Sequence, residues 1–312
     1  MSAFNPKQLI ILDNNENDAY FVYNDLLDKY PGLDIVLLIA NIRDREKLEA
    51  IFQKYKPDVV FHAAAHKHVP LMEYNPDEAV KNNVLGTMNV AECSDKTGVG
   101  RFVLISTDKA VNPSSVMGAT KRIAEMIIQA INQCSKTEFV AVRFGNVLGS
   151  SGSVVPLFRK QIEDGGPVKV THPEVSRFFM TVTEAVQLVI EAAVIAKGGE
   201  IFVLDMGEPV RIYDLARNLI RLSGLRPEID IKIEFTGLRP GEKLHEELVL
   251  AEESVRSTEN NKIFVVEPVF ISYEELKNKI REFNNININN KEKVIEFIEA
   301  IVPLCKNQQM YI

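Results

Sequence analysis

The sequence predicts an α/β fold with a doubly wound parallel sheet covered by helices on both faces. Six apolar runs of strand length recur along the first 204 residues, and amphipathic stretches lie between them. Strands that are buried on both faces have near-continuous apolar sequences, and alternation of strand and helix is typical of parallel sheets. The predicted strands are 9–12, 35–39, 59–63, 102–105, 139–144 and 201–204.

Helical spacing of apolar residues fills the intervals between these strands. The predicted helices are 44–55, 76–94, 119–133 and 183–196. Two further helices are predicted at 273–283 and 291–301. They flank an asparagine-rich run, whose composition indicates a polar connector.

The alternation of predicted strands and helices indicates the domain organisation. This alternation covers residues 1–148 and is found again at about 178–208, so we expect one domain to contain both segments. Most of residues 149–268 lack the alternation and carry glycine, proline and charge, which predicts a smaller C-terminal lobe that faces a substrate. Residues 269–312 are predicted to form a helical tail.

Composition excludes several classes of protein. The chain has 312 residues, of which 46% are hydrophobic, so it has enough apolar side chains for a globular core. A net charge of -7 argues against a partner that is nucleic acid or a membrane surface, because both require a basic field. Three cysteines without metal or redox spacing, and no apolar run of membrane-span length, predict a soluble cytoplasmic protein.

The usual opening of a dinucleotide-binding fold is not found in this sequence. Such a Rossmann-like fold begins with a strand, a glycine-rich turn and a helix that receives the pyrophosphate. Here the first strand is followed by Asp13, and an acidic residue at the end of the second strand usually holds the adenosine ribose. A helix-capping or turn aspartate is the alternative for Asp13. The glycines of residues 145–152 follow a strand but have the wrong spacing. We therefore expect an N-terminally truncated fold that lacks its first βα unit.

Loss of that unit has a physical consequence, because the first strand is central in the 3-2-1-4-5-6 strand order. Its absence leaves two strand edges unpaired. Each buried backbone group without a partner costs about 1–3 kcal/mol, against a total stability of about 5–15 kcal/mol. We expect the isolated polypeptide to be unstable, to aggregate, or to need another segment for repair; cooperative melting as a monomer would contradict this.

Polar residues follow the predicted strand 102–105 at its carboxyl end. Thr107, Asp108 and Lys109 stand there, where ligands bind in open α/β sheets. An adjacent carboxyl and amine can act as an acid and a base when burial and neighbouring charges adjust their pKa values. A surface ion pair is the alternative interpretation. Further along, Met117 and Lys121 lie four residues apart, a spacing that places both on one helix face.

These segments resemble a known family. The run Thr107 to Pro113, followed by Val116 to Lys121, is similar to the active-site segment of extended short-chain dehydrogenase/reductases that dehydrate UDP-N-acetylglucosamine. The family's usual YxxxK is MxxxK here, which marks the capsular polysaccharide branch of nucleotide-sugar 4,6-dehydratases. Methionine cannot donate a proton, so the tyrosine's proton-transfer role is not assigned to Met117; a core methionine is the alternative.

The resemblance implies a cofactor site for NAD, with NADP less favoured and binding impaired by the missing unit. Residues 61–73 are similar to the family's cofactor-lining loop, in which small alanines allow close approach of the dinucleotide. Asn41 stands where relatives often have aspartate next to adenine. No cysteine or carboxylate accompanies the histidines of this loop in a metal-binding pattern, so no metal is expected. The cofactor-binding residues implied are Asp13, Asn41, Ile42, Ala63, Ala64, Ala65, Asn83 and Lys121.

The resemblance also implies a UDP-sugar as the partner, UDP-N-acetylglucosamine or a relative of it. Residues 143–150, 177–181 and 237–243 are similar to the family's nucleotide-sugar contacts, and arginine suits a diphosphate because its planar fork makes paired bonds to oxygens. A solvated charge is the alternative for each. The substrate-binding residues implied are Lys67, His68, Asn146, Arg177, Arg239 and Glu242.

The implied reaction is an internal redox dehydration. Hydride leaves C4 of the sugar for NAD, water is lost across C5 and C6, and hydride returns to C6. Lys109 is expected to act as the base at C5, Asp108 as the acid at the C6 hydroxyl and Thr107 as a nearby hydrogen-bonding group, while Lys121 orients the nicotinamide ribose. The family further implies a homo-oligomer, and full-length relatives tethered to the inner face of a membrane. A non-catalytic remnant and a nucleotide-sugar epimerase remain as alternatives.

Overall fold

A six-stranded sheet forms the centre of the protein. The computed structural model describes residues 1–150, 152–250, 253–267 and 272–305. The strand order is β13-β14-β10-β5-β4-β3. β3, β4, β5 and β10 run parallel, and at one edge β14 pairs antiparallel with β10 and β13 pairs antiparallel with β14. The bounds are β3 (Val59–His62), β4 (Arg101–Ile105), β5 (Glu138–Arg143), β10 (Ile201–Leu204), β13 (Val255–Ser257) and β14 (Ile263–Val266).

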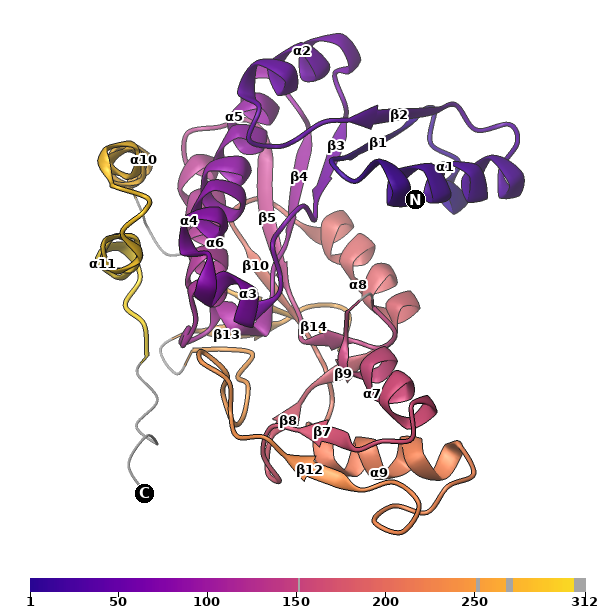
Figure 1. Cartoon of the computed structure of the whole chain (residues 1–312). Helices are drawn as coiled ribbons and strands as arrows, with labels where there is room; N and C mark the ends of the chain where they lie inside the picture. Colours follow the sequence, from indigo (N-terminus) through magenta and orange to yellow (C-terminus); the bar gives the residue numbers. More distant parts are fainter. Residues whose placement is uncertain (151, 251–252, 268–271, 306–312) are drawn as a thin grey trace.

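A second, two-stranded sheet stands apart from the first. It pairs β1 (Leu9–Asp13) in parallel with β2 (Ile35–Ile39), and α1 (Glu16–Lys29) packs against both strands (Figure 1). Among the described residues, no strand pairs with the free edges of β1 and β3. The sequence predicted two unpaired strand edges, and the structure confirms them at these two positions.

Helices cover both faces of the central sheet. The helices α2 (Arg45–Tyr55), α5 (Thr87–Thr97) and α6 (Val116–Asn132) lie on one face, and α8 (Val182–Ile195) lies on the other (Figure 1). Ser115 caps α6 because its side chain accepts a hydrogen bond from the Gly118 amide. The predicted doubly wound α/β class is therefore confirmed, and the strand bounds differ from the predicted ones by at most one residue at either end.

The C-terminal helices pack outside α6, which is why almost the whole of α6 is buried. They are α10 (Tyr273–Arg281), a 3-10 turn (Glu282–Asn285) and α11 (Lys291–Ile301), as the periodicity predicted. Leu276, Ile280 and Ile298 share one apolar cluster with Ile123 and Ile127 of α6. Part of the predicted tail, residues 269–271 and 306–312, lies outside the described residues.

The predicted helix 76–94 is interrupted. The structure has α3 (Val69–Tyr74), α4 (Pro76–Ala79) and then a π-helical segment (Val80–Gly86) before α5. A π segment adds a residue to one turn and is frequent near functional sites. Here it turns Asn83 toward the loop after β3, where its amide bonds the backbone of His66. The sequence also gave no signal for α1, because only Ala19 of that helix is buried.

A smaller lobe lies below the sheet in Figure 1 and carries its own apolar cluster. Phe158, Ile162 and Ile220 lie in that cluster. The elements are β6 (Asn146–Val147), α7 (Val154–Glu163), β7 (Val168–Val170), β8 (Ser176–Arg177), β9 (Phe179–Met180), β11 (Val210–Arg211), α9 (Ile212–Leu222) and β12 (Ile233–Phe235). They form the pairs β6–β9, β7–β12 and β8–β11. No described helix is both long and apolar enough to cross a membrane.

Candidate active site

The turn after β4 holds the predicted acid and base. Asp108 begins a 3-10 turn (Asp108–Ala110), which Thr107 caps by accepting a hydrogen bond from the Lys109 amide. The Asp108 side chain is fully buried, and its Oδ1 accepts bonds from Thr107 Oγ1 at 2.8 Å and from Lys109 Nζ at 3.0 Å. These two donors hold the Asp108 carboxyl group in position.

The Lys109 ammonium is surrounded by oxygens from three elements. It lies 3.0 Å from Asp108 Oδ1, 3.2 Å from Asn146 Oδ1 and 3.7 Å from Glu246 Oε1. Burial acts to lower the pKa of Lys109, but Asp108 and Glu246 outweigh it and raise that pKa above its ordinary value. In this arrangement Lys109 carries a proton, so it must lose that proton before it can act as a base.

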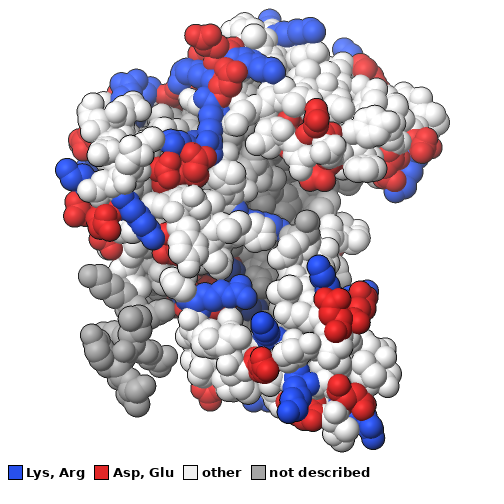
Figure 2. Space-filling model, viewed as in Figure 1, with Lys and Arg blue, Asp and Glu red and all other residues white. Residues whose placement is uncertain are grey.

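Lys109 projects into a cavity of about 240 Å³ between the sheet and the smaller lobe, which we call the basic cavity. Figure 2 shows this face of the molecule hollowed between the two lobes, with Lys and Arg atoms in the hollow. All six predicted substrate-binding residues line it. The lining residues are Lys67, His68, Val69, Pro70, Lys109, Ser114, Ser115, Asn146, Gly152, Arg177, Arg239, Gly241, Glu242, Lys243 and Glu246.

The arginines of the basic cavity differ in what their donors contact. Buried Arg177 donates to the carbonyls of Ser176, Leu244 and Lys243 and to Glu242 Oε1. Its guanidinium therefore fixes the segment 242–244 rather than pointing freely into the cavity. Arg239 is exposed, and its backbone amide donates to Glu242 Oε2. Arg239 is thus the better placed of the two for a diphosphate.

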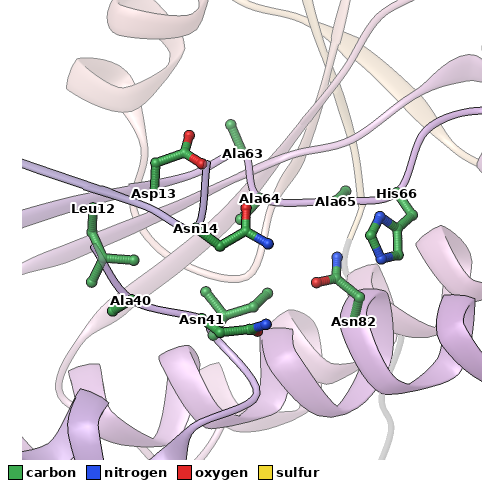
Figure 3. A pocket seen from close by; sticks show the side chains of 11 residues that line it. Leu12, Asp13, Asn14, Ala40, Asn41, Ala63, Ala64, Ala65, His66 and Asn82 are labelled. Carbon is green, nitrogen blue, oxygen red and sulfur yellow. The ribbon is translucent and has the colours of Figure 1, made fainter. Parts of the chain in front are cut away.

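A second cavity, of about 210 Å³, lies at the carboxyl ends of β1, β2 and β3, and we call it the alanine cavity (Figure 3). Six predicted cofactor residues line it, namely Asp13, Asn41, Ile42, Ala63, Ala64 and Ala65. The three alanines present only methyl groups, which leaves room for a ligand close to the backbone. Asn14, Asn82 and His66 also line this cavity and were not predicted, because an isolated Asn or His carries no motif.

The other two predicted cofactor residues, Asn83 and Lys121, lie behind the cavity walls. Buried Asn83 links the loop after β3 to α6, because its amide also donates to Thr120 Oγ1 at 3.1 Å. Lys121 Nζ donates to the Ile105 carbonyl at 2.7 Å. Burial lowers the pKa of Lys121 to about 8, although Glu125 opposes this.

Met117 and Arg143 lie away from both cavities. Met117 is buried in the apolar cluster of α6 with Val80 and Val84, so its observed contacts are those of a core residue. The segment 143–150 resembled a sugar contact, but its Arg143 is fully buried and pairs with Glu125 and Glu253, each at 2.9 Å. Asn146 is the residue of that segment that reaches the basic cavity.

Glu246 lines the basic cavity but was not predicted as a site residue. It stands three residues beyond the segment 237–243 and belongs to no motif that the sequence shows. Only the fold brings it to Lys109. As for metals, nowhere in the described ranges do three His, Cys, Asp or Glu side chains gather closely enough to hold an ion.

Comparison with known proteins places the chain in a family. Residues 1–268 match the model of a family described as polysaccharide biosynthesis protein. The probable polysaccharide biosynthesis protein EpsC of Bacillus subtilis is 61% identical over 251 residues, 80% of this chain and 42% of that protein. The chain thus spans about two fifths of the length of that relative.

Two other relatives carry names of enzymes. An inverting UDP-N-acetylglucosamine 4,6-dehydratase of Campylobacter jejuni is 35% identical over 86% of this chain and 77% of its own length. A UDP-glucose 4-epimerase of Rickettsia akari is 40% identical over 70% of this chain and 63% of its own length.

Solved structures share the fold. The X-ray structure of Pen from Bacillus thuringiensis has a TM-score of 0.77 and 37% identity, and the match covers 89% of this chain and 90% of that one. A Thermus thermophilus UDP-glucose 4-epimerase in complex with NAD has a TM-score of 0.66 over 78% of this chain and 90% of that one; at 20% identity, this likeness concerns the fold alone.

Proposed function

The chain belongs to the polysaccharide biosynthesis protein family, among the nucleotide-sugar dehydratases of the extended short-chain dehydrogenases, and from this premise we propose its activity. It dehydrates UDP-N-acetylglucosamine to a UDP-linked 4-keto-6-deoxy-N-acetyl sugar, as the catalytic part of a capsule or polysaccharide pathway enzyme. The observation that carries the proposal is the pair Asp108 and Lys109. A buried carboxylate is fixed beside an amine that opens into a cavity lined by further basic residues.

The alanine cavity fits the adenosine half of a dinucleotide. Asp13 Oδ1 accepts the Asn15 amide at 2.8 Å, and its exposed carboxylate stands at the end of β1, where a ribose hydroxyl would be bound. Ala63, Ala64 and Ala65 leave the backbone open, and Asn41 offers amide groups to a base. NAD, when bound, supplies the acceptor and the donor of hydride. NAD rather than NADP is favoured because a carboxylate at Asp13 would repel a 2′-phosphate.

Each of the chain's own residues has a role in the proposed reaction. Lys109 takes the proton from C5, and Asp108 assists loss of the C6 hydroxyl, with Thr107 as its hydrogen-bond partner. Lys121, held by the Ile105 carbonyl, orients the nicotinamide ribose. Arg239 and Lys67 neutralise the diphosphate, while Asn146 bonds the sugar beside Lys109.

A second candidate is a nucleotide-binding module without turnover. The gap between β1 and β3 favours it, because no described glycine-rich turn faces the alanine cavity to hold a pyrophosphate. An epimerase is the third candidate, supported by the relative from Rickettsia akari. Met117 in place of a proton-donating tyrosine disfavours an epimerase.

The test is to purify the chain, measure its NAD content, and follow UDP-N-acetylglucosamine by proton NMR. Dehydration gives a 4-keto sugar with a new C6 methyl signal. Epimerisation gives a C4 epimer without loss of water and would overturn the dehydratase proposal. A folded protein that binds UDP but holds no NAD and turns over nothing would favour the binding module.

A further inference from the structure

Glu246 is a buried carboxyl group in the wall of the basic cavity, and the proposed reaction does not use it. Its side chain is 3% exposed, and its Oε1 lies 3.7 Å from Lys109 Nζ and 3.7 Å from Arg177 Nε. Its other oxygen, Oε2, is buried without a hydrogen-bond partner among the described residues. A buried carboxylate oxygen in that state is costly unless it binds a proton or a ligand donor.

The two carboxyl groups beside Lys109 are held differently. Asp108 Oδ1 accepts two short hydrogen bonds, from Thr107 and Lys109, although its Oδ2 has no partner among the described residues. Glu246 makes only the two longer ionic contacts, with Lys109 and Arg177. Glu246 has the fewer hydrogen-bond donors of the two carboxyl groups, so it is the better placed of the two to receive a proton that leaves Lys109.

We propose that Glu246 accepts the proton that Lys109 must lose before it can act as a base, so that the two side chains share one proton. The inference rests on the proposed function, because it concerns the removal of the C5 proton by Lys109. In the first step an N–H bond of the Lys109 ammonium breaks and an O–H bond forms on Glu246. In the second step the free electron pair of Lys109 binds the C5 proton, and the electron pair of the C–H bond passes to the adjacent 4-keto group. The charge on the Lys109–Glu246 pair and the substrate together is conserved.

The electrostatics of the cluster support this exchange. Burial, followed by the charge of Asp108, raises the pKa of Glu246, while Lys109, Arg177 and Lys243 oppose the rise. The pKa of Lys109 is raised by Asp108 and Glu246 against the effect of burial and of Arg177. Glu246 is therefore a better proton acceptor than an ordinary carboxylate, and a small side-chain movement would bring it within hydrogen-bond distance of Lys109.

Proton sharing between Lys109 and Glu246 determines how the rate of C5 proton removal depends on pH. While the pair holds one proton, the fraction of molecules with a neutral Lys109 does not depend on pH. Without Glu246, a neutral Lys109 forms only by loss of a proton to solvent, and this fraction rises about tenfold per pH unit below the lysine pKa. A carboxylate with a purely structural role would change the rate but not this slope.

The experiment measures exchange of the C5 hydrogen of a UDP-linked 4-keto-6-deoxy-N-acetyl sugar in deuterated water, by proton NMR, between about pH 6 and pH 8. This reaction requires the base but no hydride transfer. The purified chain should exchange the hydrogen at a rate that changes by less than about twofold over this range. Glu246→Gln should exchange it more slowly at the acid end, with a slope of about tenfold per pH unit.

Glu247→Gln is the matched control, because Glu247 is the exposed neighbour and does not line the basic cavity. It should keep the flat profile. Glu246→Asp restores a carboxyl group and should return a flat profile at a lower rate. If calorimetry shows that Glu246→Gln also loses affinity for UDP, the pH profile of Glu246→Asp decides whether Glu246 accepts the proton. A flat profile in Glu246→Asp supports that role, and a sloped profile contradicts it.

The outcomes separate this inference from the proposed function. A flat profile in Glu246→Gln, with wild-type exchange intact, overturns the role of Glu246 and leaves the dehydratase proposal standing. A wild-type chain that binds UDP but exchanges no C5 hydrogen overturns both.

Discussion

The two cavities of this protein are built in opposite ways. The basic cavity is bounded by charged side chains that are buried and held by contacts with the backbone, such as Arg177 and Lys243. The alanine cavity is bounded by methyl groups, amides and the exposed Asp13, on a pair of strands whose edge is open. The comparison teaches that the groups proposed for proton transfer are pre-organised by tertiary packing, whereas the proposed adenosine site depends on a two-stranded sheet with few partners.

The largest effect should come from the base itself. Replacing Lys109 by Ala removes the amine that is held against Asp108, so C5 exchange and dehydration should fall by about a thousandfold. The rate of C5 exchange in deuterated water measures this. Lys136→Ala, at an exposed lysine, should leave the rate unchanged. Near-normal exchange in Lys109→Ala would remove Lys109 as the base.

The buried charges behind the basic cavity should dominate stability. Arg143→Leu removes the fully buried guanidinium that pairs with both Glu125 and Glu253 and leaves them the partly exposed Arg122, which should cost about 3–5 kcal/mol in the free energy of unfolding. Burial would raise the pKa of Glu125, but Arg143 lowers it to about 2, so the carboxylate is charged at neutral pH. Urea denaturation measures the loss. The exposed pair of Arg226 with Asp230 supplies the control, and Arg226→Leu should leave the midpoint unchanged.

The rate of dehydration should also depend on the close approach of α6 to the Lys109 turn. A Cβ atom on Gly118 would lie 2.2 Å from the Lys109 carbonyl oxygen, so Gly118→Ala must push the two backbones apart. We expect the rate of dehydration to fall by about tenfold to a hundredfold, since small displacements of catalytic groups have effects of this size. Gly32→Ala is the control, because a Cβ there meets no atom within 4 Å. Equal rates for the two variants would show that the Lys109 turn tolerates displacement.

The smallest effect is expected at the alanine cavity. Asp13→Asn keeps the acceptor for the Asn15 amide but removes the charge, so NAD affinity should fall by no more than about tenfold. NADP affinity should rise relative to NAD, because the repulsion of a 2′-phosphate is lost. Calorimetric titration with both nucleotides measures the ratio. An unchanged ratio would place Asp13 away from the ribose, as a turn aspartate only.

The sequence by itself determined the alternation of strands and helices, and with it which residues lie at the carboxyl edge of the sheet. Apolar runs report burial directly, so β2, β10 and α11 were predicted with their observed bounds. The family resemblance assigned Asp13, Ala63 and Ala64 to one cofactor site, and in the structure all three line one cavity at the carboxyl edge of the strands. The edges of β1 and β3 that stay unpaired among the described residues were also predicted, because the sequence shows no glycine-rich turn with the usual spacing.

Only the tertiary structure decided which charges meet. Glu246 and Lys109 are distant in sequence, and no sequence motif around either residue predicts its contact with the other. Arg143 and Arg177 look alike in sequence, yet one is buried against Glu125 and the other forms the wall of the basic cavity. The physical reason is that periodicity records whether a residue is buried, whereas the partner of a buried charge depends on how separate elements pack, and packing sets both the pKa and the chemistry of the group.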